Sequence, residues 1–266
     1  MAGVATLSVV LTGCGSDSDS DSDDSAADSP DSSAFTNDVC ETDSTSADTF
    51  KAGGILPLTG NLAFLGPPEI AGVGLAISDI NAAGGVGDAK ACHQIADSGD
   101  STDMSISTAS AGAMVAAKPS VVIGAASSSV SLNFVDTLTS EKIVQISPAN
   151  TAVDLSGYSP FFFRTAPPDG IQGNALGTLV ATDGHQKVAF LVFNDTYGTG
   201  LRDATPEAIE DAGGKIAYGA KGQGDEFPAG QTTFSAEVTA ALATSPDAII
   251  ILAFDETKAI VPELAA

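Results

Sequence analysis

Hydrophobic and polar positions follow two different periods along residues 50–266. Short apolar runs such as Val121–Ile123 predict buried strands. Between these runs, apolar residues return at steps of three and four, as Ile70, Val73 and Ile77 do, and this spacing predicts helices. The predicted elements are strands 51–56, 90–95, 121–123, 143–146, 161–164, 187–193, 215–218 and 248–254, and helices 67–83, 103–117, 127–140, 169–181, 201–212, 233–243 and 255–265.

The strands and helices alternate, which is typical of parallel sheets covered by helices. The alternation occurs twice, over residues 50–165 and 166–266, so the sequence predicts an α/β fold of two Rossmann-like lobes. In parallel sheets, ligands bind outside the carboxyl ends of the strands. Loops 57–66, 124–129 and 147–151 all lie at that end of the first sheet. We therefore expect a cleft between the lobes that closes on a small ligand.

The stretch from Val121 to Ser131 has the form of a strand, a tight turn and a helix. Ser127, Ser128 and Ser129 stand at the predicted helix start, where free N–H groups and a partial positive charge favour an anion. Serine is also a common N-cap, so an ordinary strand–turn–helix connection has the same pattern. This stretch alone leaves a carboxylate site and a structural turn both open.

Residues 1–14 are apolar and end in Leu11-Thr12-Gly13-Cys14, the pattern of a bacterial lipoprotein signal. In this interpretation Cys14 carries the lipid, and the alternative is a chance match within an ordinary signal peptide. A signal peptide begins with a basic region, but the first basic residue is Lys51. We therefore expect the true start of the protein to lie upstream of Met1.

Residues 15–49 are rich in Ser and Asp, and they carry eleven acidic and no basic side chains. Such a segment cannot bury enough apolar surface to offset the entropy of ordering, so it is expected to be a disordered tether. A calcium-binding repeat is the alternative, but the segment lacks the glycine and closing glutamate of a calcium loop. The net charge of −24 argues against nucleic acid as a partner. No apolar run approaches the roughly 20 residues of a membrane-spanning helix.

Cys40 and Cys92 are the two cysteines left once Cys14 is assigned to lipid. Exported proteins fold in oxidising compartments, which favours a disulfide between the two. This bond would attach the end of the tether to the second strand, and two free or buried thiols are the alternative.

Enzyme chemistry has little support in the sequence. The only histidines are His93 and His185, and neither lies in a loop that joins the predicted ligand rim. The sequence contains no G-x-S-x-G elbow and no G-x-x-x-x-G-K phosphate loop. Three scattered cysteines and two histidines do not form a metal cluster. We expect no catalytic activity, no cofactor and no metal.

Six segments follow one another in the order and spacing of a known family. They are G-I-L-P-L-T-G (54–60), I-S-D-I-N-A-A-G-G-V (77–86), V-I-G-A-A-S-S-S (122–129), I-S-P-A-N-T (146–151), F-F-R-T-A-P-P-D (162–169) and N-D-T-Y-G-T-G-L (194–201). Together they resemble the type I periplasmic binding proteins, and most of all the branched-chain amino acid ABC-transporter substrate-binding lipoproteins.

The resemblance implies a head-group site built from two loops. Ser127 matches the family serine that binds the ligand's α-carboxylate, and Ser128 is a second candidate. The loop after the fourth strand supplies a backbone carbonyl from Ala149 and the hydroxyl of Thr151, with Asn150 a departure toward polarity.

The remaining implied residues come from three other loops. Tyr197 matches the aromatic that packs over the ligand, and Phe64 matches an aromatic that lines the pocket. An ordinary loop tyrosine and a buried loop anchor are the respective alternatives. An acid after the last strand, Asp255 or Glu256, would pair with the ligand ammonium, although Asp255 is equally compatible with a helix N-cap.

The implied function is an extracytoplasmic solute-binding lipoprotein of an ABC importer. It would bind a branched-chain or other aliphatic amino acid between the lobes, deliver it to a membrane permease and be held at the cell membrane by its lipid. A ligand sensor of the same fold is one alternative. Another is a receptor for urea, short amides or aromatic acids.

The sequence departs from the family pattern at its end. In the family, the chain returns from the second lobe to complete both lobes, but this sequence stops at Pro262–Ala266 within a predicted helix. We therefore expect the C-terminal elements to be missing and the chain to be a fragment of a longer product.

Overall fold

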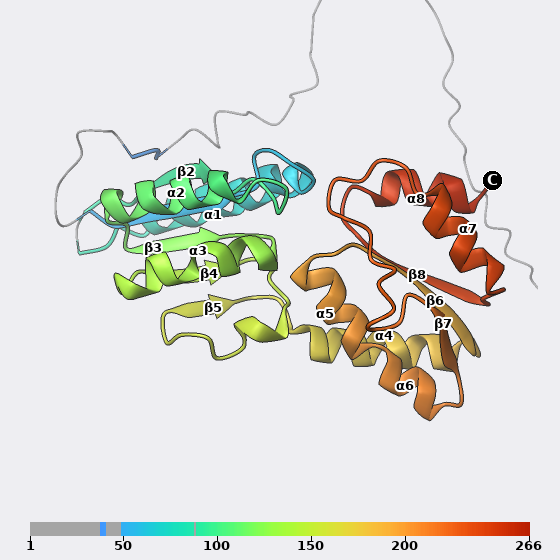
Figure 1. Ribbon diagram of the computed structural model, residues 1–266. Helices are drawn as coiled ribbons and strands as arrows, with labels where there is room; N and C mark the ends of the chain where they lie inside the picture. The colour runs from blue at the N-terminus through green and yellow to red at the C-terminus, as the bar shows by residue number, and fades with distance from the viewer. Residues whose placement is uncertain (1–37, 41–48, 88) are drawn as a thin grey trace, which may run out of the picture. The chain divides into compact units, whose positions relative to one another are not determined.

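The computed structural model describes residues 38–40, 49–87 and 89–266, which all belong to one compact unit (Figure 1). The predictions for the 1–14 signal segment, for Cys14 and for most of the 15–49 tether lie outside these residues. No helix in the described part of the chain is both long enough and apolar enough to cross a membrane.

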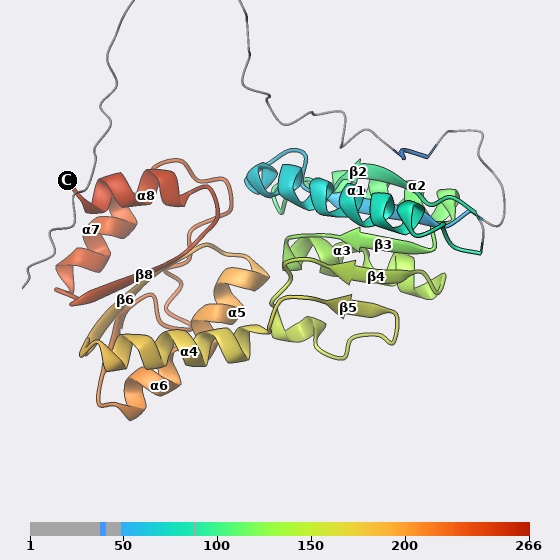
Figure 2. The same cartoon turned by 180° about the vertical axis from the view of Figure 1, so that it is seen from behind.

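The first sheet has five parallel strands in the order β2-β1-β3-β4-β5. They are β1 (Lys51–Leu56), β2 (Cys92–Asp97), β3 (Val121–Gly124), β4 (Val144–Ser147) and β5 (Phe162–Arg164). Helix α1 (Gly66–Ala82) covers one face, and α2 (Met104–Ala117) and α3 (Ser128–Ser140) cover the other (Figures 1 and 2). Two short 3-10 helices, η2 (Ala63–Leu65) and η3 (Val153–Leu155), lie in the loops after β1 and β4.

Apolar residues fill both faces of this sheet, as expected for parallel strands that are covered on each side. On one face, Val73 and Ile77 of α1 pack against Leu56 of β1. On the other face, Met114 of α2 and Phe134 of α3 belong to a separate buried cluster. The alternation of side chains along β1 thus gives each helical layer its own core.

The second sheet has three parallel strands in the order β7-β6-β8. They are β6 (Lys187–Val192), β7 (Lys215–Tyr218) and β8 (Ala248–Leu252). Helices α4 (Asp169–Thr182), α5 (Thr196–Ala204) and α6 (Pro206–Asp211) pack on one face, and α7 (Ser235–Ala243) and α8 (Thr257–Leu264) pack on the other (Figures 1 and 2).

One predicted helix is wrong in its bounds. The sequence predicts a loop over 194–200 and a single helix over 201–212, but α5 already begins at Thr196 and a second helix begins at Pro206. Asp195 starts α5 because its carboxylate accepts the backbone N–H of Tyr197 at 3.0 Å. Thr205 keeps helical backbone angles, but Pro206 has no N–H to donate to the preceding turn, so the helical hydrogen-bond ladder is interrupted there and α6 begins.

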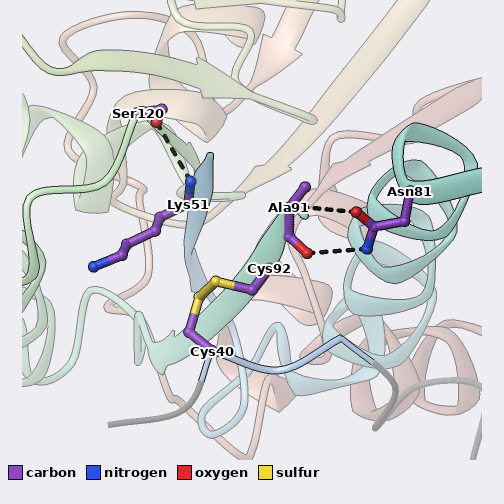
Figure 3. Close-up of a disulfide and its surroundings, with 6 residues drawn as sticks. All are labelled: Cys40, Lys51, Asn81, Ala91, Cys92 and Ser120. Atoms are coloured by element: carbon purple, nitrogen blue, oxygen red, sulfur yellow. Dashed lines mark hydrogen bonds between the residues drawn. A yellow bond between two sulfur atoms is a disulfide. The ribbon is translucent and has the colours of Figure 1, made fainter. Parts of the chain in front are cut away.

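Cys40 and Cys92 form a disulfide, as the sequence predicts, with their Cα atoms 4.9 Å apart (Figure 3). The backbone N–H of Cys40 also donates to the carbonyl of His93 at 2.9 Å, so residue 40 lies along the start of β2. On the other side of β2, the Asn81 side chain exchanges two hydrogen bonds with the backbone of Ala91 (Figure 3). These contacts hold the beginning of β2 between α1 and the segment that precedes β1.

Candidate ligand-binding site

A cavity of about 260 Å³ lies at the carboxyl ends of the strands. Its wall comes from the loops after β1, β3, β4, β6 and β8 and from the first turn of α4. The lining residues are Leu62, Phe64, Leu65, Ala126, Ser128, Ala149, Thr151, Gln172, Tyr197, Ala253 and Phe254.

The turn between β3 and α3 supplies the polar edge of the cavity. Gly124 has a φ of 123°, and a side chain there would collide with the backbone carbonyl of Ile55, so the turn needs glycine. Ser127 is the N-cap of α3, and its hydroxyl accepts the backbone N–H of Val130 at 3.3 Å. Ser127 is therefore used by its own helix, and Ser128 is the serine that reaches the cavity.

Buried side chains join this turn to the loop after β4. The Ser128 hydroxyl accepts the backbone N–H groups of Thr151 and Ala152, both at 3.2 Å. In the other direction, the Asn150 amide donates to the carbonyl of Ala126, and the Ser147 hydroxyl donates to the carbonyl of Ala125. The two loops therefore form one rigid wall.

Five of the nine predicted ligand residues line the cavity, namely Phe64, Ser128, Ala149, Thr151 and Tyr197. Two others lie behind its wall. Ser127 is only 3% exposed and caps α3, while Asn150 is fully buried and joins the two loops. Neither presents its side chain to the cavity, although both neighbour residues that do.

The structure does not bring Asp255 and Glu256 to the cavity. Asp255 forms an ion pair with Lys258 at 2.5 Å. The Glu256 carboxylate is turned away from the cavity and accepts hydrogen bonds from Asn61, Gly230 and Phe254. These acids are thus engaged by other protein groups and neither lines the cavity, so the expectation of a cavity carboxylate at either position is not met.

Asp169 is a residue that the sequence reasoning missed. It is fully buried at the start of α4, and neither of its carboxylate oxygens has a hydrogen-bond partner within the described residues. Its backbone N–H donates to the carbonyl of Thr151 at 2.7 Å, and a Cβ on Gly200 would lie 3.1 Å from its Oδ2 atom. The carboxylate therefore lies between the Thr151 loop and α5.

The electrostatics of Asp169 reflect this position. Burial raises the pKa of Asp169 above its ordinary value, and the nearby Thr151 hydroxyl and Arg164 charge lower it by less. The Thr151 hydroxyl lies close without the geometry of a hydrogen bond, and it too is buried without a partner in the described chain. Burial also raises the pKa of Tyr197, and the charge of Asp169 adds to this increase. The only earlier signal for Asp169 was its place at the end of the F-F-R-T-A-P-P-D segment.

Aromatic and aliphatic side chains form the rest of the wall. The rings of Tyr197 and Phe254 stack with centroids 5.4 Å apart and an interplanar angle of 5°. Leu62, Leu65 and Phe64 supply apolar surface from the loop after β1. Across the described residues, no group of three or more His, Cys, Asp or Glu side chains is arranged to hold a metal ion.

A ligand-sized cavity lined by the strand-end loops of two parallel sheets is the arrangement expected of a solute-binding protein. The comparison with known families agrees, because residues 49–266 match the family described as "Periplasmic binding protein". The chain belongs to this family, which confirms the resemblance to type I periplasmic binding proteins. Proteins of this family bind substrates and are not enzymes.

One similar curated protein is the leucine-, isoleucine-, valine-, threonine-, and alanine-binding protein of Pseudomonas aeruginosa. It is 34% identical over 177 residues, which make up 65% of this chain and 47% of that protein. The chain thus spans about half the length of the curated relative that it matches.

Two solved structures have the same fold. A solute binding protein of Rhodopseudomonas palustris, in complex with 3,4-dihydroxybenzoic acid, has a TM-score of 0.70 at 22% identity, covering 82% of this chain and 58% of that one. A leucine binding protein of Thermotoga maritima has a TM-score of 0.68 at 22% identity, covering 76% and 55%. At these identities the likeness concerns the fold.

Proposed function

We propose that this protein is the extracytoplasmic solute receptor of an ABC importer and that it binds an aliphatic amino acid in the cavity. The observation that carries this proposal is the buried Asp169 carboxylate behind the cavity-lining Thr151: within the described residues, neither its oxygens nor the Thr151 hydroxyl has a partner with hydrogen-bond geometry. Native proteins rarely leave buried polar groups unpaired, and a buried charge without a partner is costly. A ligand ammonium would donate to both groups and would offset that cost.

The opposite end of an amino acid would meet Ser128. The Ser128 hydroxyl already accepts two backbone N–H groups, so its own proton remains available for donation. A ligand carboxylate would accept this proton. A donor at Ser128 together with an acid at Asp169 suits a zwitterion better than a simple acid or a simple amine.

The size and lining of the cavity support a small apolar side chain on the ligand. About 260 Å³ is slightly below the range of roughly 300–1,000 Å³ for small-molecule sites. The apolar wall of Leu62, Leu65 and Phe254 would accept an aliphatic group. The Pseudomonas aeruginosa relative is named for binding leucine, isoleucine, valine, threonine and alanine, which agrees with this ligand class.

An aromatic acid is the second candidate ligand. The stacked pair of Tyr197 and Phe254 offers a flat face to the cavity, and the Rhodopseudomonas palustris structure holds 3,4-dihydroxybenzoic acid. An aromatic acid has no ammonium and would leave Asp169 unpaired, so we favour the amino acid. Urea and short amides have neither an ammonium to pair with Asp169 nor an aliphatic group to pack on the apolar wall, so they fit the cavity less well than an amino acid.

Delivery to a membrane permease, and attachment to the membrane through a lipid on Cys14, complete the proposal. Membership of the periplasmic binding protein family supports a location outside the cytoplasm. The Leu11–Cys14 pattern supports the lipid anchor.

A sensor that signals ligand to a membrane partner has the same fold and cavity. Mass spectrometry of the membrane-extracted protein would test the anchor, and uptake of labelled leucine in a deletion strain would separate transport from sensing.

Calorimetric titration of the full chain with three matched compounds tests the ligand class. The compounds are leucine, 4-methylpentanoate, which is leucine without its amino group, and 3,4-dihydroxybenzoate. We expect leucine to bind and 4-methylpentanoate to bind at least tenfold more weakly, because only leucine has an ammonium for Asp169. Equal binding of leucine and 4-methylpentanoate, or tight binding of dihydroxybenzoate alone, would refute the amino-acid assignment.

A further inference from the structure

A hydrogen bond outside the cavity joins the loops of the two sheets. The side-chain amide of Asn61, in the loop after β1, donates to the Oε1 atom of Glu256, after β8, at 2.7 Å. Neither residue lines the cavity, but Leu62 and Phe254 beside them do. The bond therefore connects two segments that each supply residues to the cavity wall.

The Glu256 end of this contact is fixed by its own half of the chain. Glu256 is 5% exposed. Its Oε1 atom accepts the backbone N–H of Gly230 at 3.1 Å, and its Oε2 atom accepts that of Phe254 at 3.0 Å. Two backbone donors thus orient the carboxylate, so little side-chain freedom is lost when Asn61 binds.

At the other end of the contact, a buried carboxylate holds the backbone of Asn61. The backbone N–H of Asn61 donates to Oδ2 of Asp100 at 2.6 Å, and Asp100 is 5% exposed. The other oxygen of Asp100 accepts the backbone N–H of Thr102 at 2.8 Å. A Cβ on Gly230 would lie 3.2 Å from the Thr102 methyl carbon, so these two segments are in close contact beside the hydrogen bond.

We propose that the Asn61–Glu256 hydrogen bond is a latch that holds the cavity closed without contacting the ligand. Separation of the two loops would leave a buried carboxylate with one fewer charge-assisted hydrogen bond, so the latch favours the closed state. A ligand that is held by the closed state then leaves more slowly, because the loops must separate before it can dissociate. The effect on ligand rests on the proposed function, whereas closure itself is independent of it.

Pulsed electron paramagnetic resonance between spin labels on exposed positions tests the latch without ligand. The labels are attached at Asp79→Cys on α1 and Glu210→Cys on α6, so they report the distance between the parts of the chain built around the first and the second sheet. The full chain also carries Cys14→Ser and keeps the Cys40–Cys92 disulfide. Asn61→Asp sets a second carboxylate against Glu256, and Asn61→Ala removes the donor alone. Asn174→Asp, on the exposed side of α4, adds the same charge as a control.

We expect one dominant distance in the parent chain and in Asn174→Asp. In Asn61→Asp that population should shift to longer distances, with a smaller shift in Asn61→Ala. Unchanged distributions in both Asn61 variants would overturn the latch. Circular dichroism spectra establish that each variant is folded, and Asn61→Ala serves as the test if Asn61→Asp is not.

Dissociation of radiolabelled leucine provides the second test. We expect dissociation about tenfold faster in Asn61→Ala, with an association rate close to that of the parent chain. Equal dissociation rates would contradict the latch. A parent chain that binds no leucine counts against the amino-acid proposal, while the distance measurement still decides the latch.

Discussion

The backbone N–H of Asp169 donates to the carbonyl oxygen of Thr151 at 2.7 Å. This contact joins the first residue of α4 to the loop after β4 and brings the Asp169 carboxylate near the Thr151 hydroxyl. Both side chains are buried and lack protein partners among the described residues, and Thr151 lines the cavity. Asp169 itself lies behind Thr151 and does not line the cavity. In the proposed site this pair receives the ligand ammonium, so it gives that proposal its most direct test.

Asp169→Asn should weaken leucine binding by roughly 10- to 100-fold, the range for loss of a hydrogen bond to a charged group. The same change should raise the thermal midpoint of the ligand-free protein. Burial raises the pKa of Asp169, so the ionised carboxylate destabilises the folded state above the ordinary aspartate pKa, and asparagine removes that charge. Calorimetric titration and thermal unfolding at pH 7 measure the two effects.

Asp183→Asn is the matched control, because Asp183 is exposed at the C-terminal end of the same helix. It should leave leucine affinity unchanged and should raise the thermal midpoint less than Asp169→Asn does, because it removes only an exposed charge at the helix C-terminus. An Asp169→Asn protein that binds leucine as well as the wild type would show that Asp169 is not the partner of the ammonium.

Ser127, Ser128 and Thr151 should respond differently to substitution, although the sequence groups them together. Ser127→Ala removes the N-cap of α3 and should cost about 1 kcal/mol of unfolding free energy, with little change in affinity. Ser128→Ala leaves two buried backbone N–H groups without an acceptor and should cost about 1–3 kcal/mol of unfolding free energy, besides weakening binding.

Thr151→Val should lower unfolding free energy less than Ser128→Ala does, because it strands no buried N–H group and removes only the nearby hydroxyl that favours the ionised form of Asp169. It should weaken leucine binding by roughly tenfold. Urea unfolding and calorimetric titration separate the three outcomes. If Ser127→Ala lowers affinity more than Ser128→Ala does, the assignment of Ser128 as the cavity serine is wrong.

Glu69, in the first turn of α1, should make stability depend on pH. Burial raises its pKa from 4.5 to about 7, and its Oε2 atom is buried without a partner in the described residues. Between these two values the folded state keeps a proton that the unfolded state releases, so stability should fall as pH rises from about 4.5 to 7. Glu69→Gln, which remains neutral, should lack this contribution.

Between pH 5 and 8, Glu69 should lower the unfolding free energy by about 1–2 kcal/mol. This is less than the whole pKa shift implies, because Glu69 is partly exposed and lies at the positive end of α1. Urea unfolding of both proteins at several pH values measures it. Parallel stability curves for the wild type and Glu69→Gln would contradict the prediction, and Glu207→Gln in the first turn of α6 is an exposed control.

The Cys40–Cys92 disulfide should contribute about 2–4 kcal/mol to stability, because the cysteines are 52 residues apart and the bond restricts the unfolded chain. Dithiothreitol should lower the urea midpoint of the wild type to that of the Cys40→Ser/Cys92→Ser variant. The double variant itself should not respond to reductant. A wild-type midpoint that is the same with and without reductant would contradict this contribution.

Most of the fold could be predicted from the sequence because its signals are local. The predicted strands at 51–56 and 215–218 match β1 and β7, and the other strands differ from prediction by one or two residues at their ends. The error at α5 has a local cause as well. Gly198 and Gly200 indicate a loop, but the Asp195 cap and packing of Leu201 in the core beneath the second sheet stabilise a helix there.

The site could be predicted only in part, because its residues come from six segments. The loops after β1, β3, β4 and β6 were recognised, and they supply Phe64, Ser128, Thr151 and Tyr197 to the cavity. The choice between neighbours, such as Ser127 or Ser128, depends on which hydroxyl faces the helix and which faces the cavity. Only the orientation of the turn shows which way each hydroxyl faces, and the spacing of residues along the chain does not reveal that orientation.

The sequence by itself determined the alternation of strands and helices, the strand ends that carry polar loops, and the two cysteines available for a bond. These features follow from hydrophobic period and turn residues, which act over a few neighbouring positions. Tertiary structure alone decided that Glu256 is satisfied by backbone donors, while Asp169 is buried without a hydrogen-bond donor among the residues that the structure describes. The pairing of a carboxylate depends on which distant segments surround it, and only the packed chain brings those segments together.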